Sequence, residues 1–518
     1  MQPPLRVGIK LDARSKLPLH RQIFDEVVAR IEARAFPPGY KLPATRVLAQ
    51  ELSTHRNTVA RAYAELEAAG FVSSGVGRGT FVEATLPSAR PGHGTSQPVR
   101  EGAGLPWSAL LSRAARSDAI ERVERRAPTE GRSAINLVHT QPSADLIPDE
   151  LLRRCIMHAL SGHALSTLSY APPEGTLRLR EQVARDLVMR GVPARAEEII
   201  ITSGSQQGLD LVARALLNPG DTLLVEPTTY SGAIELFTLA GARLVSVPTD
   251  ASGPDPAGLE RAYRPEVKAL YLMPNAHNPT GRTMPAERRR ALVAWSRASG
   301  VPIIEDDYAA GLELEPEQEP IPHLRALDGE VIHVSTFSKR LAPALRMGYV
   351  VAPAALRPVL TATKRVVDLG ASLVLQQALA EFMERGYLRA HAGRMREVYR
   401  ARRDALEVAL KKALPPGVHW HTPTHGLVLW LTLPAGLDGE RVADEAERAG
   451  VLVGPGSLWS VGARSAGALR LSFSAEPEAR LAEAARRLGK VLKQLLARPK
   501  HAEPAAPESV AEALLEVI

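Results

Sequence analysis

Cysteine is nearly absent from this chain of 518 residues, since Cys155 is the only one. A disulfide within the chain and every metal or iron–sulfur site built from several cysteines are therefore excluded. Aromatic residues make up only 4% of the sequence, so the core must consist mainly of alanine, leucine and valine. No run of about 18 apolar residues is present, and the first residues lack the apolar stretch of a signal peptide. We expect a soluble, cytoplasmic protein.

Positive charge is concentrated near the start of the sequence. The chain has a formal net charge of +7, and residues 1–82 hold 12 lysines and arginines against 7 acidic residues. Residues 83–132 hold 8 against 6, and the remainder is balanced. A basic arm on a neutral body favours a polyanionic partner such as nucleic acid, although an excess of this size also arises by chance.

Composition divides the chain into four segments. Residues 14–83 alternate helical periodicity with short breaks, and residues 84–132 include a stretch dense in proline, glycine and serine that predicts a flexible linker. In residues 133–497, amphipathic helices alternate with the strand-like runs EEIIITSG, DTLLVEP, ARLVSVP, VKALYLMP, VPIIEDDY and VIHVSTFS. This alternation predicts an α/β domain with a mostly parallel sheet. Residues 498–518 form a tail without an assigned role.

The basic N-terminal segment has the element order of a winged helix-turn-helix. Its first helix carries an apolar stripe from Ile23 to Ile31, a second helix begins at Thr45, and Ser53-Thr54-His55 offers hydroxyl groups to cap a third. In that third helix, RNTVARAYAELEAAG, the apolar positions Val59 to Leu66 are expected to be buried. FVSSGVGRGTFV then predicts a hairpin with a basic, glycine-rich tip. A winged helix-turn-helix places the first turn of its recognition helix in the major groove of DNA.

This segment resembles the DNA-binding domain of the GntR family. The resemblance rests on LPATR (Leu42–Arg46), on HRNTVARAYAELEAAG and on the wing GRGTFV. In that family, the arginine of the LPxxR element, the start of the recognition helix and the wing contact DNA, and these contacts divide into phosphate positioning and base recognition. The resemblance implies as DNA-binding residues Arg46, Arg56, Asn57, Thr58, Arg61, Arg78 and Gly79.

The long α/β segment carries the residue types that pyridoxal 5′-phosphate requires. Lys339 follows a predicted strand in VSTFSKRLAPALRMGY, Arg346 comes seven residues later, and Asp306 lies upstream in IIEDDY. The motifs PNAHNPTG and TSGSQQGLD precede them. A lysine forms a Schiff base with the cofactor, a carboxylate keeps its ring nitrogen protonated, and a helix N-terminus with an arginine binds its phosphate. Each motif alone is a weak signal, but five in this order are a strong one.

The order and wording of these motifs resemble fold-type-I aminotransferases over roughly residues 136–497. The resemblance implies that Lys339 is the Schiff-base lysine, that Asp306 pairs with the ring nitrogen, and that Arg470 in ALRLSFS binds the carboxylate of an amino-acid ligand. Tyr170 would reach the phosphate of a neighbouring subunit. The other implied cofactor contacts are Ser205, Gln206, Tyr230, Asn278, Tyr308, Ser338 and Arg346. No metal site is indicated.

A winged helix joined to an aminotransferase-like body is the architecture of MocR-type regulators, and nearly the whole chain fits it. The resemblance implies a transcription factor that binds pyridoxal 5′-phosphate, a double-stranded DNA operator and, in some members, an amino acid or amine. It also implies a head-to-tail homodimer. The alternative is an active amino-acid aminotransferase with an appended DNA-binding domain, because all the catalytic residues are present and the same fold serves true enzymes.

The identity of the effector stays open. The 4-aminobutyrate-responsive member of the family has a second arginine soon after the tyrosine that stacks on the cofactor, whereas here Tyr230 is followed by Ser231-Gly232-Ala233. This disfavours 4-aminobutyrate as the effector, and the local sequence is more similar to that of aminoadipate or kynurenine-type aminotransferases. A regulator of vitamin B6 synthesis that senses the cofactor itself also stays open.

Overall fold

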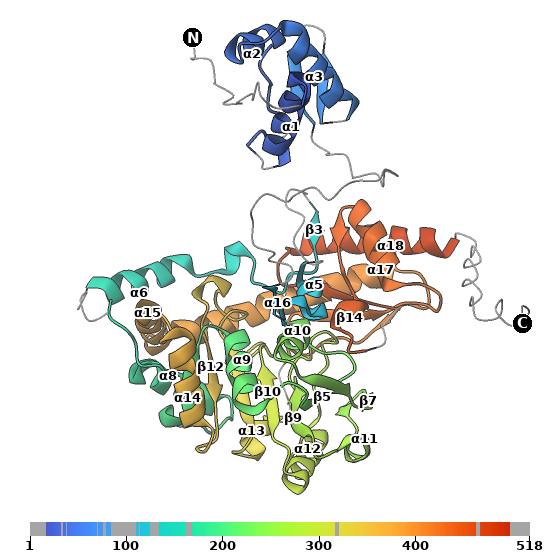
Figure 1. Cartoon of the computed structure of the whole chain (residues 1–518). Coiled ribbons are helices and arrows are strands. Elements are labelled where there is room, and N and C mark those ends of the chain that lie inside the picture. The colour runs from blue at the N-terminus through green and yellow to red at the C-terminus, as the bar shows by residue number, and fades with distance from the viewer. Residues whose placement is uncertain are drawn as a thin grey trace, which may run out of the picture. The chain divides into compact units, whose positions relative to one another are not determined.

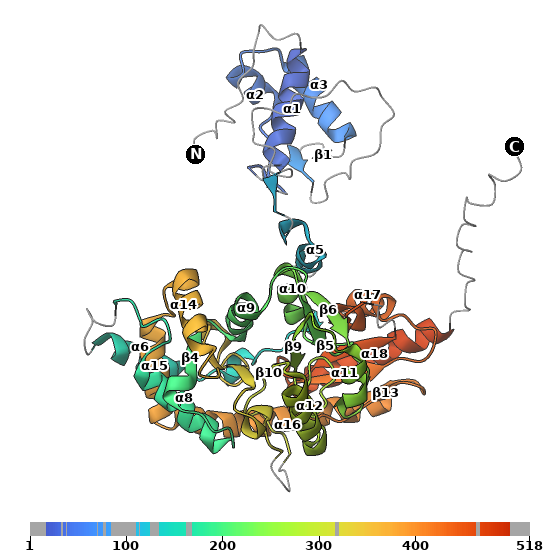
Figure 2. The same ribbon diagram turned by 60° about the horizontal axis from the view of Figure 1, so that its bottom comes forward.

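The computed structural model divides into two compact units, Met1–Leu105 and Pro106–Ile518, drawn in Figures 1 and 2. In the part of the chain that is described, no helix is long and apolar enough to cross a membrane. The predicted tail over 498–518 lies outside the described residues. The structure describes residues 17–32, 35–37, 39–69, 71–75, 79–83, 110–112, 114–124, 134–161, 168–315, 321–462 and 467–497.

The first unit has the three helices and the hairpin of a winged helix-turn-helix, as the sequence predicts. Their cores meet at Ile23, Val59 and Leu66, which are fully buried. The hydroxyl of Tyr63 donates a hydrogen bond to the carbonyl of Pro43 (2.9 Å), which ties the third helix to the loop before the second. The elements are α1 (Leu19–Glu32), α2 (Thr45–Glu51), α3 (Arg56–Ala68) and the antiparallel strands β1 (Val72–Gly75) and β2 (Gly79–Val82).

The turn before α3 differs from the expectation. The N-cap of α3 is His55, whose side chain makes no capping hydrogen bond, so the predicted hydroxyl cap is wrong. The N–H groups of Ser53 and Thr54 donate instead to the carbonyls of Gln50 (3.3 Å) and Ala49 (2.9 Å). Both residues are therefore used to close the end of α2.

The second unit is built on a seven-stranded sheet with the order β4-β12-β11-β10-β9-β5-β6. Among its described strands, β12 alone runs antiparallel to its neighbours, so the sheet is mostly parallel as predicted. Each of the six strand-like runs named above forms a strand, and β12 adds one that was not predicted. The strands are β4 (Ile199–Thr202), β5 (Thr222–Val225), β6 (Arg243–Ser246), β9 (Val267–Leu272), β10 (Ile303–Asp307), β11 (Ile332–Thr336) and β12 (Gly348–Val351).

Helices and short strands surround this sheet. The second sheet, β13-β14-β17-β16, is antiparallel. Its strands and the remaining short ones are β3 (Ile135–Asn136), β7 (Thr249–Asp250), β8 (Gly253–Pro254), β13 (His419–Trp420), β14 (Val428–Thr432), β15 (Val451–Leu452), β16 (Gly454–Pro455) and β17 (Ala468–Ser472). The α-helices are α5 (Asp118–Glu124), α6 (Asp149–Ser161), α8 (Leu177–Met189), α9 (Ser205–Leu216), α10 (Ser231–Leu239), α11 (Pro256–Ala262), α12 (Ala286–Ser299), α13 (Leu324–Leu327), α14 (Arg357–Asp368), α15 (Leu373–Glu384), α16 (Tyr387–Ala413), α17 (Gly439–Arg448) and α18 (Glu478–Ala497). The 3-10 turns are η1 (Ala114–Arg116), η2 (Ala144–Leu146), η3 (Ala196–Glu198), η4 (Pro343–Leu345) and η5 (Gly456–Trp459).

Both faces of the large sheet are buried. Along β4, Ile200 belongs to one core cluster, whereas Ile199 and Ile201 belong to another. β9 alternates in the same way between Tyr271 and Leu270. Helix α9 packs against β11 and β12, and α14 packs against α9 (Figure 2). Burial on both faces explains why these strands appear in the sequence as continuous apolar runs.

Part of the predicted flexible linker is structured. Within residues 84–132, η1 and α5 are helical, and α5 packs against α10. Ala119 is only 3% exposed, and Arg122 donates a hydrogen bond to the carbonyl of Leu458 (3.1 Å). The prediction of a flexible linker is therefore wrong for residues 114–124, because this stretch buries apolar surface against the second unit. Residues 84–109 and 125–133 lie outside the described residues.

Because each unit has its own core, we expect Leu66→Ala to destabilise the first unit alone. Leu66 is fully buried, and such a truncation costs about 2–5 kcal/mol of the free energy of unfolding. All 5 tryptophans lie at position 107 or beyond, so their fluorescence reports on the second unit and far-UV circular dichroism reports on both. Urea unfolding should show an earlier circular-dichroism transition with an unchanged fluorescence midpoint. An equal shift in both signals would contradict independent units.

Candidate functional site

A pocket of about 290 Å³ lies at the carboxyl ends of the parallel strands, which is where open α/β sheets bind ligands. Its side chains come from the ends of β4, β5, β9, β10 and β11 and the segments that follow them, from the segment after β3, from η5 and from β17. Every cofactor contact implied by the sequence except Tyr170 lines it, as does the implied carboxylate ligand. These residues are Ser205, Gln206, Tyr230, Asn278, Asp306, Tyr308, Ser338, Lys339, Arg346 and Arg470.

Asp306, on the central strand β10, is the buried acid of the pocket. Its Oδ2 accepts a hydrogen bond from the Tyr271 hydroxyl (2.8 Å) on the neighbouring strand β9. Its Oδ1 has no hydrogen-bond partner in the described chain, nor has the hydroxyl of Tyr308. Burial raises the pKa of Asp306 to about 7, although the bond from Tyr271 opposes this shift. Such a carboxylate gains most from a cationic partner in the pocket.

Lys339 lies in the turn that follows β11. Burial and the nearby guanidinium groups of Arg470 and Arg346 lower the pKa of Lys339 to about 8, while Asp306 works in the opposite direction. A lysine with a pKa in this range has a substantial neutral fraction near physiological pH. Neutral amines are nucleophiles, so Lys339 is suited to attack a carbonyl carbon.

The N-terminus of α9 and Arg346 form an anion-binding corner. Gly204 is the N-cap of α9, with φ 85°, and it has no side chain to occupy the N–H groups of the first turn. A Cβ on Gly204 would lie 2.9 Å from the Arg346 guanidinium, which in turn donates to the carbonyl of Ser203 (3.2 Å). Backbone N–H groups of a helix start together with a guanidinium are suited to a phosphate.

Gln206 differs in detail from its implied role as a phosphate ligand. Its side-chain amide donates to the carbonyl of Gly232 (2.9 Å), and its side-chain carbonyl accepts from the Tyr230 hydroxyl (3.2 Å). Both ends of the side chain therefore hold the Tyr230 loop in place. Its backbone N–H, in the first turn of α9, is the group suited to an anion.

Arg470 projects from β17 into the pocket. Its guanidinium donates to Asn278 Oδ1 (2.9 Å) and to the carbonyl of Val138, and it lies 4.1 Å from the ring centroid of Trp459. These contacts fix a cation in the wall of the pocket. A fixed guanidinium is suited to a ligand carboxylate.

The sequence analysis missed several residues of this site. Tyr271 was part of a predicted strand, and its register beside β10 would have placed it next to Asp306 only if the strand order had been known. Ser231 follows Tyr230, Met273 lies in the run VKALYLMP, and Thr336 and Pro343 lie within VSTFSKRLAPALRMGY, whereas the remaining ones come from segments without a recognisable motif. The missed lining residues are Val138, Thr140, Ser231, Met273, Thr336, Pro343, Leu458 and Trp459.

Tyr170 does not line this pocket. Its side chain is 83% exposed, and it follows residues 162–167, which lie outside the described chain. The adjacent Leu168 is also exposed. Tyr170 therefore has no role within its own subunit's pocket.

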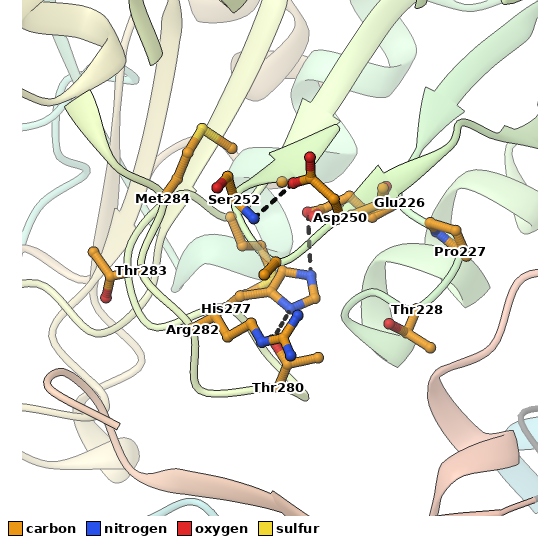
Figure 3. Close-up of a pocket in the computed structure, with 14 residues that line it drawn as sticks. Glu226, Pro227, Thr228, Asp250, Ser252, His277, Thr280, Arg282, Thr283 and Met284 are labelled. Atoms are coloured by element: carbon orange, nitrogen blue, oxygen red, sulfur yellow. Dashed lines mark hydrogen bonds and ion pairs between the residues drawn. The ribbon is translucent and has the colours of Figure 1, made fainter. Parts of the chain in front are cut away.

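Figure 3 shows residues that line a second cavity, of about 200 Å³. It adjoins the first, since Met273 lines both. Within it, His277 Nε2 lies 3.1 Å from the carboxylate of Glu226, and its Nδ1 lies 2.7 Å from the Thr280 hydroxyl. Glu226 belongs to the loop that carries Tyr230, and His277 precedes Asn278. This contact therefore braces two loops that form the first pocket.

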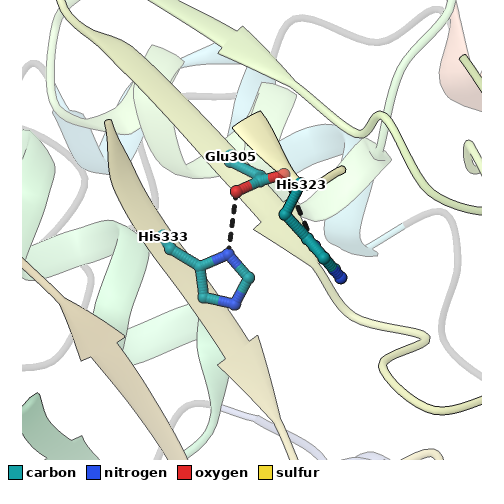
Figure 4. A group of neighbouring side chains, drawn as sticks. All are labelled: Glu305, His323 and His333. Atoms are coloured by element: carbon teal, nitrogen blue, oxygen red, sulfur yellow. Dashed lines mark hydrogen bonds and ion pairs between the residues drawn. The ribbon is translucent and has the colours of Figure 1, made fainter. Parts of the chain in front are cut away.

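Glu305, His323 and His333 form a buried group with residue types that also bind metals (Figure 4). Glu305 accepts hydrogen bonds from the N–H groups of Leu324 (2.9 Å) and Arg325 (3.1 Å) at the start of α13. One of its oxygens also lies 2.9 Å from His333 Nδ1. Since both carboxylate oxygens already have donors, hydrogen bonding accounts for the group, which connects β10, β11 and α13.

The first unit exposes most of the implied DNA-binding residues. Arg46 on α2 and Arg56, Asn57 and Arg61 on α3 are exposed, and Thr58 is half-buried. Except for Arg61, these positions lie in the first turn of each helix of the helix-turn-helix.

Contacts distinguish among these residues. The Arg56 guanidinium lies 3.4 Å from the Thr45 hydroxyl, so the starts of α2 and α3 adjoin. Arg61 is paired with Glu65 one turn later (3.2 Å), which partly neutralises it. Gly79 begins β2 with φ 109°, and Arg78 lies outside the described residues.

Comparison with known proteins identifies both parts. Residues 19–82 match the family described as "Bacterial regulatory proteins, gntR family", and residues 146–488 match "Aminotransferase class I and II". The regulator TauR of Rhodobacter capsulatus is 33% identical over 92% of this chain and 96% of its own length. The chain belongs to the MocR-type subfamily of GntR regulators.

Two further relatives support the assignment. The "probable rhizopine catabolism regulatory protein MocR" of Rhizobium meliloti is 35% identical over 77% of this chain and 78% of its own length. The crystal structure of LysN, an α-aminoadipate aminotransferase of Thermus thermophilus complexed with N-(5′-phosphopyridoxyl)-L-leucine, covers 76% of this chain and 100% of its own. It superposes with a TM-score of 0.69 at 32% identity.

Pyridoxal 5′-phosphate is the cofactor of this MocR-type chain, and the pocket suits it on chemical grounds. The unpartnered oxygens of Asp306 and Tyr308 offer an acceptor for a protonated ring nitrogen and a donor for a phenolic oxygen. The bare N-cap Gly204 beside Arg346 leaves room for a phosphate. Lys339 supplies the amine.

We expect the Lys339 amine of the cofactor-free protein to titrate near pH 8. Labelling by an amine-directed reagent, followed by mass spectrometry, should therefore rise with pH through an inflection near 8. Arg470→Ala should move the inflection upward, because it removes a cation that disfavours the ammonium form. Asp306→Asn should move it downward, because it removes the anion that favours that form. An inflection that stays near 10.5, the ordinary value, would contradict this environment.

Proposed function

We propose that this MocR-type regulator changes its affinity for an operator according to what its pocket holds. Pyridoxal 5′-phosphate would be one ligand, and an amino acid or amine bound beside it would be the other. One observation carries the proposal: a pocket with a buried carboxylate oxygen that has no hydrogen-bond partner among the described residues, Asp306 Oδ1, and a recognition helix with an exposed basic first turn occur in the same chain. We take residues 14–83 as the DNA-binding domain and 133–497 as the ligand-binding domain.

Different residues of the pocket would bind different parts of the ligand. When bound, the cofactor supplies a protonated ring that withdraws electrons. Asp306 would hold the ring proton, Tyr308 and Asn278 would donate toward the phenolic oxygen, and Tyr230 would stack on the ring. Lys339 would hold the cofactor covalently. Its phosphate would bind the first turn of α9 at Ser205 and Gln206, with Ser338 and Arg346, and Arg470 would bind the effector's carboxylate.

A homodimer in the head-to-tail arrangement is part of the proposal. The exposure of Tyr170, 83%, and its position outside its own pocket support a role in a neighbouring subunit. A site completed by two chains links cofactor binding to subunit association.

An active aminotransferase is the second candidate. It is favoured by the presence of Lys339, Asp306 and Arg470 in one pocket and by the similarity to LysN. Steady turnover of an amino acid with a 2-oxo acid would establish it. Binding of the same ligands without turnover would support the regulator and not the enzyme.

The test of the proposed function measures the coupling between pocket and operator. Operator should be titrated at fixed salt into cofactor-free protein, with and without pyridoxal 5′-phosphate and candidate amino acids. We expect a change in affinity of about 5–150-fold, which corresponds to a coupling of roughly 1–3 kcal/mol. Lys339→Ala should lose borohydride-reducible cofactor and most of this change. Identical isotherms under all conditions would remove the sensor and favour the enzyme.

Two substitutions separate base recognition from phosphate contact. Arg56→Ala, at the start of the recognition helix, should weaken binding to the specific operator by about 1–3 kcal/mol. Arg46→Ala should weaken specific and non-specific binding alike, because phosphates occur in every sequence. Arg21→Ala, which removes an exposed arginine of α1, is the control and should change little. Binding should fall steeply with salt, and equal behaviour of Arg56→Ala and the control would contradict this docking mode.

A further inference from the structure

Lys364 on α14 is a cation buried outside the pocket, and the proposed function does not use it. It is 0% exposed, and it occupies the buried stripe of α14 with Leu360, one turn earlier. Lysine is rarely fully buried unless it is paired. Its Nζ lies 2.5 Å from Asp368 Oδ2 and 3.3 Å from Gln207 Oε1.

Gln207 connects this ion pair to the anion-binding corner. It lies in the first turn of α9, and its Oε1 accepts the N–H of Ser203 (2.8 Å). Its Nε2 donates to Asp368 Oδ2 (2.7 Å). The amide therefore has one orientation, because its oxygen faces two donors and its nitrogen faces an acceptor.

The loop before α9 is thereby held from two sides. Gln207 binds the N–H of Ser203, and Arg346 binds its carbonyl (3.2 Å). The next residue is Gly204, whose φ of 85° and missing side chain allow many other conformations in the absence of such restraints. The direction of the N–H groups of the first turn of α9 depends on this loop.

The hydrogen-bonded group of Gln207, Lys364 and Asp368 is anchored at its other end by α14. Asp368 Oδ1 accepts the N–H of Gly370 (2.9 Å), and a Cβ on Gly370 would lie 3.0 Å from the carbonyl of Ala171. Hydrogen bonds from Lys364 and Gln207 hold the pKa of Asp368 below its usual range, although burial acts in the opposite direction. The Asp368 carboxylate thus stays charged at neutral pH.

We propose that Gln207, Lys364 and Asp368 are positioning residues for the cofactor's phosphate. They fix the Ser203–Ser205 loop from behind, and none of them lines the pocket. The inference rests on the proposed function only in taking this corner as the phosphate site. A merely structural ion pair on α14, hydrogen-bonded to Gln207 of α9, would affect the stability of the unit without distinguishing between ligands that have and lack a phosphate.

The experiment compares pyridoxal 5′-phosphate with pyridoxal, which has the same ring and aldehyde but no phosphate. Both are titrated into the full-length, cofactor-free protein and followed by visible absorption. In Lys364→Met/Asp368→Asn, we expect the dissociation constant for pyridoxal 5′-phosphate to rise about tenfold or more, equivalent to roughly 1.4 kcal/mol. The constant for pyridoxal should change less than about twofold, since a preorganised loop aids only the group it binds.

The matched control is Arg297→Met/Asp328→Asn. Asp328 also pairs with a basic side chain (2.7 Å) and also accepts the N–H two residues later (3.0 Å), but these hydrogen bonds involve neither Gln207 nor the Ser203–Ser205 loop. The control should leave both constants unchanged. Gln207→Met cuts the connection while keeping the ion pair, and it should show the same selective loss if the double variant does not fold.

The outcomes separate the two proposals. Equal loss of affinity for both ligands, or no loss for pyridoxal 5′-phosphate, in both Lys364→Met/Asp368→Asn and Gln207→Met would overturn the positioning role. Failure of the unaltered protein to bind pyridoxal 5′-phosphate would instead overturn the proposed function.

Discussion

The buried carboxylate of Asp306 is the constraint on which the pocket depends. A charged group inside a protein is costly unless it is paired, and β10 carries three acidic residues in succession. Alternation along the strand sends Glu305 and Asp307 to one face and Asp306 to the other. On the first face, His333 and the start of α13 satisfy Glu305, and Arg190 pairs with Asp307 at 3.0 Å. Among the described residues, the Asp306 carboxylate accepts a hydrogen bond from Tyr271 alone.

The same contrast appears in their titration. Although burial acts in the opposite direction, the contacts with His323 and His333 hold the pKa of Glu305 well below its usual range, and the charges of His323 and Arg190 lower the pKa of Asp307. Burial raises the pKa of Asp306 to about 7. Asp306 is therefore the acid of this strand that is suited to pair with a ligand, whereas Glu305 and Asp307 bind other parts of the protein. A cationic ring nitrogen next to Asp306 would give this buried carboxylate a partner of opposite charge.

Function in this chain comes from the combination of its two units. The aminotransferase-like unit alone is compatible with catalysis and with sensing, because a fold hosts more than one function. The winged helix supplies the reason to read the pocket as a sensor. A ligand can alter DNA binding only if it favours one arrangement of the chain over another. Helix α5 packs on α10, and it is among the parts of the second unit that are nearest in sequence to the DNA-binding segment.

The sequence by itself determined the elements and the residue types of both sites. Short motifs around Lys339, Asp306 and Arg56 are local, because each needs a particular turn or strand end next to a particular side chain. The order of strands and helices followed from the alternation of apolar runs. Composition misled at residues 114–124, where a charged stretch after the Pro/Gly-rich segment buries Ala119.

Tertiary structure decided which residues support those motifs. Tyr271 reaches Asp306 only through the pairing of β9 with β10. Trp459 and Arg470 meet across more distant segments, and Lys364 acts on α9 across the contact between two helices. Apart from Arg470, which the motif ALRLSFS had singled out, these residues lie outside the motifs, because each works on a neighbour in space that is far away in the chain. Sequence patterns record local chemistry, whereas burial, pairing and the direction of a hydrogen bond are properties of the folded chain.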